Sequence, residues 1–574
     1  MPVMHKATSV SNRKLFHFHG GLHLPDNKSQ STGDPVRKAP IPARLIVPLQ
    51  QHIGEIAEPL VTVGERVLKG QLIARAQGYI SAPVHAPTSG TVADIAEHLI
   101  PHPSGLTGLC VVIDSDCRDE WIDLPEPLTS YHNSDPAELR ERIRQSGIVG
   151  LGGAAFPTSV KINPGPETWI KTLIINGAEC EPYITCDDML MREHPQRIIS
   201  GIEILMHLLK PERVLVGIED NKPEAIGAMR EAAASSGLTG LEVVPIPTLY
   251  PSGGEKQLIR VLTGKEVPSG AIPAKIGIVC HNVGTAAAIA DAVLEGKPLI
   301  SRLVTVTGEG VKTPANFEVL IGTPARNLIE LAGDYTSKIS KLILGGPMMG
   351  FTLNDDAAPI TKAANCLLAA SGHEAPDPGP ATPCIRCGQC AAVCPVNLLP
   401  QQMYWYARAK DLEKTQEYHL FDCIECGCCS HVCPAHIPLV QYYRYAKTES
   451  WAQEQEKQKA EQARKRHEVR VARLERLEAE RQAKLRMKKE ALAKKPAAKK
   501  SNDADGADPK KAAIEAAMKR AAEKKAKLTE QGVAPQNTEN LTPAQQAKID
   551  QAETRRKASH SATTVTDTTE SQDG

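Results

Sequence analysis

Hydrophobic and polar residues alternate in different ways along the chain, and each way predicts a different kind of element. Between residues 41 and 125, apolar residues come in short runs such as LIVPL and PLVTVG, separated by Gly and Pro. This pattern is typical of short strands in a small β sandwich or barrel. From 135 to 300, apolar strands such as TLIIN and RVLVGI alternate with stretches of helical spacing such as PQRIISGIEILMHLL. Such alternation predicts an α/β domain with a mostly parallel sheet.

The remaining patterned segments complete a multidomain α/β fold. Residues 301–350 contain RLVTVTG, FEVLIG, TPARNLIELAG and KLILGG, and this order of strand, strand, helix and strand predicts a small β-grasp module. A cysteine-rich module occupies 377–446 and opens with the linker DPGPATP. Residues 1–40 are set apart as an N-terminal segment.

The C-terminal part of the chain has no apolar face that could be buried. Residues 447–495 are charged on every side, which predicts a solvated helix, and 496–574 have the composition of a disordered tail. We expect the tail to be a solubilising extension; a docking helix for a partner or an anionic surface is the alternative.

Composition narrows the possible partners and the compartment. The 574 residues include 67 basic and 67 acidic side chains, and this zero net charge gives no reason to expect nucleic acid as a partner. The chain begins without the apolar run of a signal peptide, and no stretch reaches the roughly 18 to 20 apolar residues of a membrane span. We therefore expect a cytoplasmic protein whose membrane association, if any, is peripheral. Nine of the 15 cysteines lie between Cys384 and Cys433, which indicates metal ligation rather than disulfides.

Two cysteine motifs carry the most specific signal in the sequence. CIRCGQCAAVCP (384–395) and CIECGCCSHVCP (423–434) both have the form C-x2-C-x2-C-x3-C-P, in which the fourth cysteine ligates the other iron–sulfur cluster. A pair of zinc sites is the disfavoured alternative, because zinc prefers separated C-x2-C pairs. We predict a helical module with two [4Fe–4S] clusters, one on Cys384, Cys387, Cys390 and Cys433, the other on Cys394, Cys423, Cys426 and Cys429. The other cysteines are interpreted as ordinary reduced thiols.

A glycine-rich stretch, GLGGAAFPTSVK (150–161), contains the dinucleotide fingerprint G-x-G-x-x-A. That fingerprint normally follows a strand and opens a helix, with an acidic residue about 20 residues later. Here a predicted helix, ELRERIRQSG, comes before the glycines, Pro157 follows them, and the acidic residue is missing. The stretch is therefore not interpreted as the start of a Rossmann unit.

Further motifs give the glycine-rich stretch a different meaning. GLGGAAFPT, Lys161, NGAECEP (176–182), YPSGGEKQ (250–257) and HNVGT (281–285) occur in the order and spacing that resemble the flavoprotein subunit of respiratory complex I and related NAD-linked hydrogenases. VGERVLKGQLIA and APTSGTV resemble a biotinyl/lipoyl hammerhead domain, which we expect to be unmodified because no lysine lies between Lys69 and Lys161. With the β-grasp (SLBB-like) module and the two cysteine motifs, the chain from Lys14 to Ala446 resembles the RnfC family, the C-type subunits of Rnf (Rsx) ion-translocating electron-transport complexes.

This resemblance implies a set of cofactor contacts. Backbone N–H groups of the glycine loop would approach the phosphate of FMN, and Lys161 would add a positive charge. Phe156 would stack on NADH and Glu181 would accept hydrogen bonds from NADH hydroxyls. Leu151, Ala155 and the sequence GGEK depart from the complex I pattern, which bears on the nicotinamide contacts more than on the flavin contacts. The FMN contacts implied by the resemblance are Gly150, Gly152, Gly153, Lys161, Asn176, Glu179, Gly254, Glu255 and Asn282.

The resemblance also implies the function. Electrons would pass between NADH, FMN, two [4Fe–4S] clusters and partner subunits, in either direction, with no catalytic side chain beyond the cofactors. The expected partners are integral and peripheral subunits of the same complex at the cytoplasmic face of the bacterial inner membrane, and indirectly a ferredoxin or flavodoxin. Two alternatives stay open: a non-catalytic iron–sulfur wiring and docking subunit with an empty flavin site, and a soluble NAD-linked diaphorase subunit.

Overall fold

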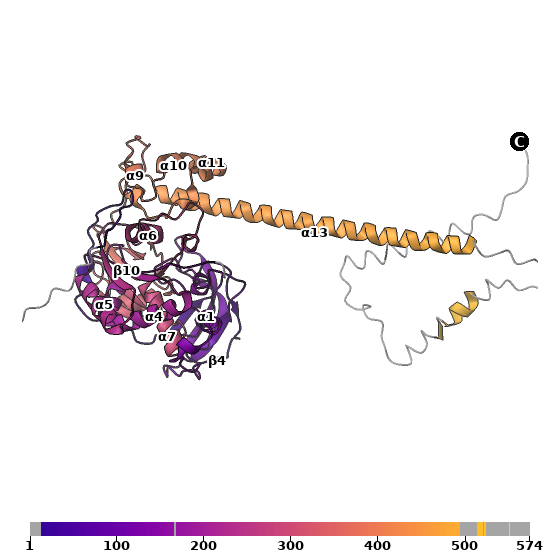
Figure 1. Cartoon of the computed structure of the whole chain (residues 1–574), viewed down its shortest axis with the longest axis horizontal. Coiled ribbons are helices and arrows are strands. Elements are labelled where there is room, and N and C mark those ends of the chain that lie inside the picture. The colour runs from indigo at the N-terminus through magenta and orange to yellow at the C-terminus, as the bar shows by residue number, and fades with distance from the viewer. Residues whose placement is uncertain (1–12, 166–167, 494–513, 521, 524–549, 551–574) are drawn as a thin grey trace, which may run out of the picture. The chain divides into compact units, whose positions relative to one another are not determined.

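The structure is a computed structural model that describes residues 13–165, 168–493, 514–520, 522–523 and 550 (Figure 1). The chain divides into two units, residues up to Ala463 and residues from Arg464 onward. Among the described helices, none combines the length and the apolar character needed to cross a membrane.

Two small sheets form the first domain. The four-stranded sheet has the order β2 (Arg44–Pro48), β8 (Thr107–Ser115), β7 (Gly90–Leu99) and β4 (Arg66–Val67), and all its pairs are antiparallel. The three-stranded sheet has the order β3 (Glu58–Pro59), β5 (Leu72–Arg75) and β6 (Val84–His85). Alternate apolar residues of both sheets, such as Leu45, Val47, Ile73 and Ile113, meet in one core.

A parallel sheet organises the second domain. Its order is β11 (Leu241–Ile246), β10 (Arg213–Glu219), β9 (Thr172–Gly177) and β12 (Ile278–Asn282). Leu173 and Ile175 of β9 face a core formed with α4 (Pro195–Leu209), α5 (Pro223–Ser236) and α7 (Val283–Leu294), whereas Ile174 faces α6 (Glu255–Thr263). Both faces are therefore covered by helices, as parallel sheets require. Helices α1 (Pro136–Gln145), α2 (Thr158–Lys161) and α3 (Cys186–Glu193) complete the domain.

The strand order of this sheet reverses beside β9. Strands β9, β10 and β11 follow one another in one direction, and β12 then lies on the other side of β9. In such sheets, ligands bind outside the carboxyl ends of the strands, at the point where the order reverses. The crevice between β9 and β12 is therefore where a cofactor is expected.

The third domain is a mixed six-stranded sheet with α8 (Ala325–Leu331). Its order is β1 (Arg37–Lys38), β14 (Ala315–Leu320), β13 (Ser301–Thr307), β17 (Cys366–Ser371), β15 (Ile339–Leu344) and β16 (Phe351–Thr352). The sequence pattern predicted an end of this module at 350, but β17 lies between β13 and β15 and extends the sheet to Ser371. Every residue of β17 is buried, so its sequence CLLAAS lacks the alternation that marks a half-exposed strand.

Short helices and one long helix form the cysteine-rich module. They are α9 (Gln389–Ala392), α10 (Pro400–Arg408), α11 (Leu412–Glu417), α12 (Cys428–His431) and α13 (Leu439–Ala493). Helix α13 begins earlier than residue 447 because its first turns, which include Tyr443 and Ala446, are buried in the module's core. The described side chains between residues 451 and 491 are exposed. The predicted disorder of 496–574 falls mostly on residues that the structure does not describe. Within this stretch the structure describes 514–520, 522–523 and 550, and these residues are helical.

The N-terminal segment contacts the other domains of the first unit in turn. The N–H of Phe16 donates to the Val261 carbonyl of α6, and Leu22 forms a β-bridge with Tyr250. The N–H of Gly21 donates to the carbonyl of Val393 in the cysteine-rich module, and β1 then joins the edge of β14. Few of these contacts could be expected from the sequence, because the segment contains almost no regular structure beyond the single turn η1 (Lys28–Gln30). The other such turns are η2 (Tyr131–Asn133), η3 (Pro273–Ile276) and η4 (Leu420–Asp422).

Candidate functional site

Two cavities in the cysteine-rich module are lined by the cysteines of both motifs. One contains Cys384, Cys387, Cys390 and Cys433, and the other contains Cys394, Cys423, Cys426, Cys428 and Cys429. The fourth cysteine of each motif thus faces the cavity of the other motif. Four thiols facing a common cavity are a donor set that fits a [4Fe–4S] cluster. Cys428 is a fifth thiol at the second cavity, although the motif spacing gives it no place among the ligands.

Both motifs adopt the same backbone conformation around their cavities. Arg386 and Glu425 each have φ 57°, and Gly388 and Gly427 have φ values of 78° and 81°. These two glycines precede α9 and α12 in a left-handed conformation, which a residue with a Cβ adopts at a cost. A Cβ on Gly427 would also lie 2.6 Å from the carbonyl oxygen of Met348. The glycine in each motif therefore allows the tight bend around the cavity.

The glycine loop lies at the carboxyl edge of the parallel sheet, beside the reversal of strand order. It is a turn closed by the N–H of Gly150, which donates to the carbonyl of Phe156 at 2.8 Å. A Cβ on Gly152 would lie 3.4 Å from the Asn282 side chain at the end of β12. The N–H of Leu151 donates to Oγ1 of Thr285, in the first turn of α7, at 3.0 Å. The loop is thereby attached to the positive end of a helix dipole.

The exposed tip of this loop offers backbone donors. Gly152, Gly153 and Ala154 are exposed, and within the described residues their N–H groups donate to no protein acceptor. Gly153 has φ 104°, a conformation that residues other than glycine rarely adopt. Successive free amides near a helix N-terminus form an anion-binding concavity. This geometry fits the phosphate group of FMN.

Two buried basic side chains, Arg302 and Lys362, contact the backbone at the start of the glycine loop. Arg302, at the start of β13, donates to the carbonyls of Leu151, at 3.3 Å, and of Lys362. The Nζ of Lys362 donates to the carbonyls of Gly147, at 2.7 Å, and Pro83, at 2.9 Å. The carbonyls of Gly147 and Leu151, which lie on either side of the start of the loop, are therefore both hydrogen bonded. The third domain, through β13 and the loop between β16 and β17, thus contributes to the shape of a site that was predicted to belong to the α/β domain alone.

The two asparagines predicted for the flavin site are brought together by strand pairing. Asn176 of β9 is in register with Asn282 of β12. Asn282 Oδ1 accepts the N–H of Gly284 and so caps α7, and its Nδ2 donates to Oδ2 of Asp187 at 2.6 Å. Asn176 Nδ2 donates to the carbonyl of Gly253 at 2.8 Å. The asparagines thus join the glycine loop, α3 and the loop at 250–254.

A third group of predicted residues lies nearby. Lys161 Nζ is 2.5 Å from Oε1 of Glu255 and donates to the carbonyl of Cys280 at 3.0 Å. Gly254 caps α6 just before Glu255, and a Cβ there would lie 2.5 Å from Oε1 of Gln257. The charge that was predicted to contact the flavin is therefore already paired with a carboxylate.

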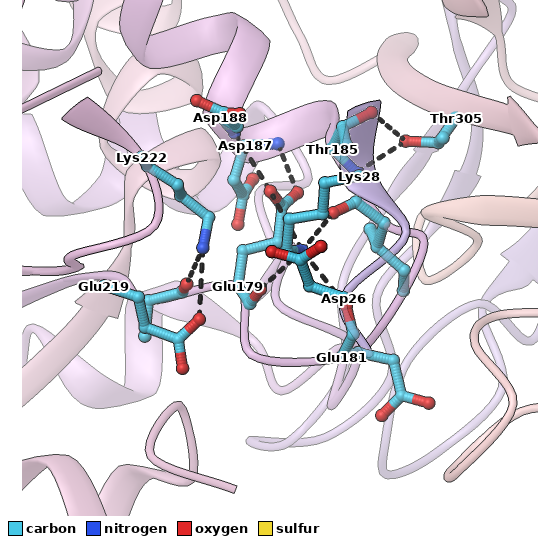
Figure 2. Close-up of polar contacts among 12 residues, drawn as sticks. Asp26, Lys28, Glu179, Glu181, Thr185, Asp187, Asp188, Glu219, Lys222 and Thr305 are labelled. Atoms are coloured by element: carbon cyan, nitrogen blue, oxygen red, sulfur yellow. Dashed lines mark hydrogen bonds and ion pairs between the residues drawn. The ribbon is translucent and has the colours of Figure 1, made fainter. Parts of the chain in front are cut away.

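The two glutamates of NGAECEP are engaged by the protein itself. Glu179 accepts the N–H groups of Asp187, at 2.7 Å, and Asp188, at 3.2 Å, at the start of α3. Burial raises the pKa of the Glu179 carboxyl, which nearby Lys28 opposes (Figure 2). Glu181 Oε1 accepts the N–H groups of Met348 and Met349, at 2.7 and 3.1 Å. Glu181 was predicted to accept hydrogen bonds from NADH hydroxyls, and in the structure its Oε1 binds two backbone donors of the loop after β15.

Several residues of this site were not predicted from the sequence. Asp187 connects Glu179 to Asn282, Arg302 and Lys362 hold the glycine loop, and Lys28 lies beneath the NGAECEP loop. The only available signal was the acidic pair that opens α3 in the sequence CDD, which favours a helix N-terminus. The three basic residues carry no local signal, because each acts on a loop far from it in the sequence.

One contact joins the parallel-sheet site to the second cysteine cavity. Tyr250 Oη donates to the carbonyl of Cys426 at 2.7 Å, and Tyr250 is buried. Tyr250 begins the loop that ends at Gly254, so one wall of the candidate flavin site is bonded to the cavity of Cys394, Cys423, Cys426 and Cys429. Lys256 Nζ and Oδ1 of Asp422 form an ion pair at 3.3 Å between the same two domains.

Four family models match the chain in the order of its domains. They are the RnfC barrel sandwich hybrid domain over 16–118, the Nuo51 FMN-binding domain over 143–291, the SLBB domain over 303–352 and the 4Fe-4S dicluster domain over 383–437. The modules expected in the α/β, β-grasp and cysteine-rich regions are confirmed at this level. The barrel sandwich hybrid domain covers the region interpreted as a hammerhead.

Curated relatives carry the name of the C-type (RnfC) component of an ion-translocating oxidoreductase complex. The chain is 52% identical over 469 residues to the relative from Pseudomonas aeruginosa, covering 82% of this chain and 60% of that protein. For Klebsiella pneumoniae the values are 46% over 565 residues, 98% and 72%, and for Serratia proteamaculans 46% over 546 residues, 95% and 75%. The chain thus spans three fifths of the length of the Pseudomonas relative.

Among solved structures, the chain is similar to an NAD+-reducing [NiFe]-hydrogenase in the H2-reduced state. The TM-score is 0.40 and the identity 17%, over 56% of this chain and 67% of that chain. A likeness of this size supports no conclusion about cofactors.

Proposed function

Because the chain belongs to the RnfC family of ion-translocating oxidoreductase complexes, we propose that it carries electrons between NADH, FMN and two [4Fe–4S] clusters. The family matches include an FMN-binding domain and a 4Fe-4S dicluster domain. A flavin converts the two electrons of a hydride into the single electrons that iron–sulfur clusters accept. The chain is then the NADH-linked oxidoreductase subunit of a translocase, and its partners are the integral and peripheral subunits of that complex.

The hydrogen bond between Tyr250 and Cys426 is the single observation that carries this proposal. It bonds a loop of the candidate flavin site to the backbone of a predicted cluster ligand at 2.7 Å. One-electron transfer needs redox groups that lie close together, and this hydrogen bond connects a loop of the candidate flavin site to a predicted ligand of a cluster. We therefore assign Cys394, Cys423, Cys426 and Cys429 to the inner cluster, and Cys384, Cys387, Cys390 and Cys433 to the outer one.

The residues of the chain have separate tasks in this scheme. The amides of Gly152, Gly153 and Ala154 bind the phosphate, with the N-terminus of α7 adding a favourable dipole. Asn176 and Asn282 hold the surrounding loops at the strand ends. Phe156, which is half-buried, stacks on NADH, and Glu181 accepts hydrogen bonds from NADH hydroxyls.

The proposed location is the cytoplasmic face of the bacterial inner membrane, where the chain binds other subunits peripherally and is linked through them to a ferredoxin or flavodoxin. A soluble diaphorase subunit would share the cofactors but not these partners. Tight co-purification with integral membrane subunits separates the two.

The test uses the full chain, reconstituted anaerobically with iron and sulfide. We expect FMN to bind and NADH to bleach the flavin and then to reduce the clusters, observed by absorbance and electron paramagnetic resonance. Iron and sulfide without FMN binding, and no bleaching by NADH, would favour the non-catalytic wiring subunit.

A further inference from the structure

A lysine of the N-terminal segment is buried beneath the loop that carries NGAECEP. Lys28 is only 6% exposed, although it lies in a segment with little regular structure. Its Nζ donates to the carbonyls of Glu179, at 2.8 Å, Glu181, at 3.1 Å, and Ile184 (Figure 2). These are three acceptors for the three N–H groups of an ammonium, and Oε2 of Glu179 lies 3.9 Å away. Such a set of partners fits a charged lysine rather than a chance contact.

The loop around Lys28 has a conformation that needs support. Glu179 and Tyr183 have φ values of 47° and 70°, in the left-handed region that non-glycine residues rarely adopt. Backbone of this kind persists where surrounding contacts determine it, and it is common at functional sites. Besides Lys28, the same segment supplies the carbonyl of Asp26, which accepts the N–H of Tyr183 at 2.7 Å. Ser31 Oγ hydrogen bonds to Oγ1 of Thr185 at 2.8 Å.

A set of side-chain contacts connects this loop to the candidate flavin site. The carboxylate of Glu179 accepts the first amides of α3, which fixes Asp187. Asp187 accepts a hydrogen bond from Asn282, and Asn282 lies against Gly152 of the glycine loop. Lys28 is thus the start of a continuous set of contacts that ends at the proposed phosphate site.

We propose that Lys28 is a positioning residue of the flavin site, so that the N-terminal segment is part of that site although it lies outside the FMN-binding domain. This inference rests on the proposed function. The same segment is bonded to the inner cluster's module, because Gly21 donates to the carbonyl of Val393 and His19 Nδ1 hydrogen bonds with the carbonyl of Cys394 at 2.9 Å. Residues 19–31 therefore fix the position of the NGAECEP loop relative to the inner cysteine cavity.

The experiment compares Lys28→Met with Lys69→Met in the reconstituted full chain. Lys69 is a matched control, since it is 7% exposed and paired with Asp119 at 2.6 Å, in the first domain. We expect Lys28→Met to weaken FMN binding about tenfold, because three charge-assisted hydrogen bonds to the loop are lost. Iron content should not change, and Lys69→Met should keep the FMN affinity within about twofold. FMN affinity is measured by quenching of flavin fluorescence.

A second measurement covers the possibility that Lys28→Met binds the clusters poorly. Without FMN, amide hydrogen exchange at Asp187 and Asp188 should become faster in Lys28→Met and in the milder Lys28→Gln, but not in Lys69→Met. Unchanged FMN affinity and unchanged exchange in both Lys28 variants would overturn the inference. Failure of the unaltered chain to bind FMN would instead reject the proposed function, so the two failures can be told apart.

Discussion

The cysteine-rich module and the carboxyl edge of the parallel sheet hold their candidate redox groups in opposite ways. In the module, all the donors are thiols from two short motifs with the same backbone conformation, and these motifs share one core. At the sheet edge, the groups facing the candidate phosphate are backbone amides. Their direction is set by side chains from β13, the loop between β16 and β17, and the N-terminal segment.

This difference predicts two kinds of response to substitution. Replacing a thiol removes a ligand, so the loss should be all or none for that cluster. Replacing a residue that orients amides changes the shape of a loop, so the loss of affinity should be graded.

The largest effect is expected from Cys426→Ser. It removes one thiolate of the inner cluster, so the iron content of the reconstituted chain should fall by about half, to a single [4Fe–4S] cluster. The remaining cluster is identified by electron paramagnetic resonance, and iron is measured chemically. Cys394→Ser should abolish the same cluster although it belongs to the other motif.

Cys428→Ala is the matched control for this substitution. Cys428 borders the same cavity and is fully buried, but lies outside the C-x2-C-x2-C-x3-C spacing. Full iron content is expected in this variant. A loss of iron here, with retention in Cys426→Ser, would reverse the assignment of the ligands.

The same contrast explains which parts of the site were predictable from the sequence. The two cysteine sets follow from spacing within each motif, and the structure gathers them at two cavities. Asn176 and Asn282 were implied by the resemblance to the complex I flavoprotein, and strand register brings them together. Their partners did not follow, because Arg302, Lys362 and Lys28 reach the site from distant segments with no local pattern.

Prediction of the fold from the sequence has the same limit. Elements with a regular period, such as β9, β10 and α4, were predicted where they occur, whereas β12 was not predicted as a strand. Strand β17 was missed since it is buried on both faces, and β1 since two residues at a sheet edge carry no period. The contacts of the Glu181 carboxylate with the amides of Met348 and Met349 were not predicted either, because these residues lie in another domain.

The second prediction concerns Asn282→Ala, compared with Asp135→Ala. Both side chains cap a helix by accepting an N–H at 2.8 Å, from Gly284 in α7 and from Ala137 in α1. Each variant should lose about 1 kcal/mol of unfolding free energy. Only Asn282→Ala should also weaken FMN binding, by about tenfold, since it releases Asp187 beside the glycine loop. Equal FMN affinities in the two variants would contradict the assembled site.

The third prediction compares Gly153→Ala with Gly237→Ala. Both glycines have positive φ, 104° and 68°, and a Cβ at either would meet nothing within 4 Å. Each substitution therefore strains only the backbone, at a cost of about 1 kcal/mol in unfolding free energy. Gly153→Ala should in addition lower FMN affinity several-fold by turning the amides of the loop tip, whereas Gly237→Ala, at the end of α5, should not. Flavin titration alongside urea unfolding separates the two effects.

The smallest effect is a pH dependence that sharpens the contrast between two buried lysines. Lys28 has three carbonyl acceptors and a nearby carboxylate, whereas Lys362 donates to two carbonyls, the number that a neutral amine can serve. Burial lowers the pKa of Lys362 to about 7, from the ordinary 10.5. Between these values the unfolded chain binds a proton that the folded chain does not, so stability rises with pH and is lost as pH falls toward 7.

The slope of unfolding free energy against pH measures this proton. In the flavin-free chain we expect it to be steeper than in Lys362→Met by up to about 1 kcal/mol per pH unit between roughly pH 7.5 and 9.5. His52 and His85 lie beside Lys362, but burial lowers their pKa values to about 4 and about 3, so they titrate below this window. Equal slopes in the two proteins would mean that Lys362 stays charged in the fold. The side chain of Lys362, which contacts the start of the glycine loop, would then be a second buried ammonium, like Lys28, rather than a neutral donor.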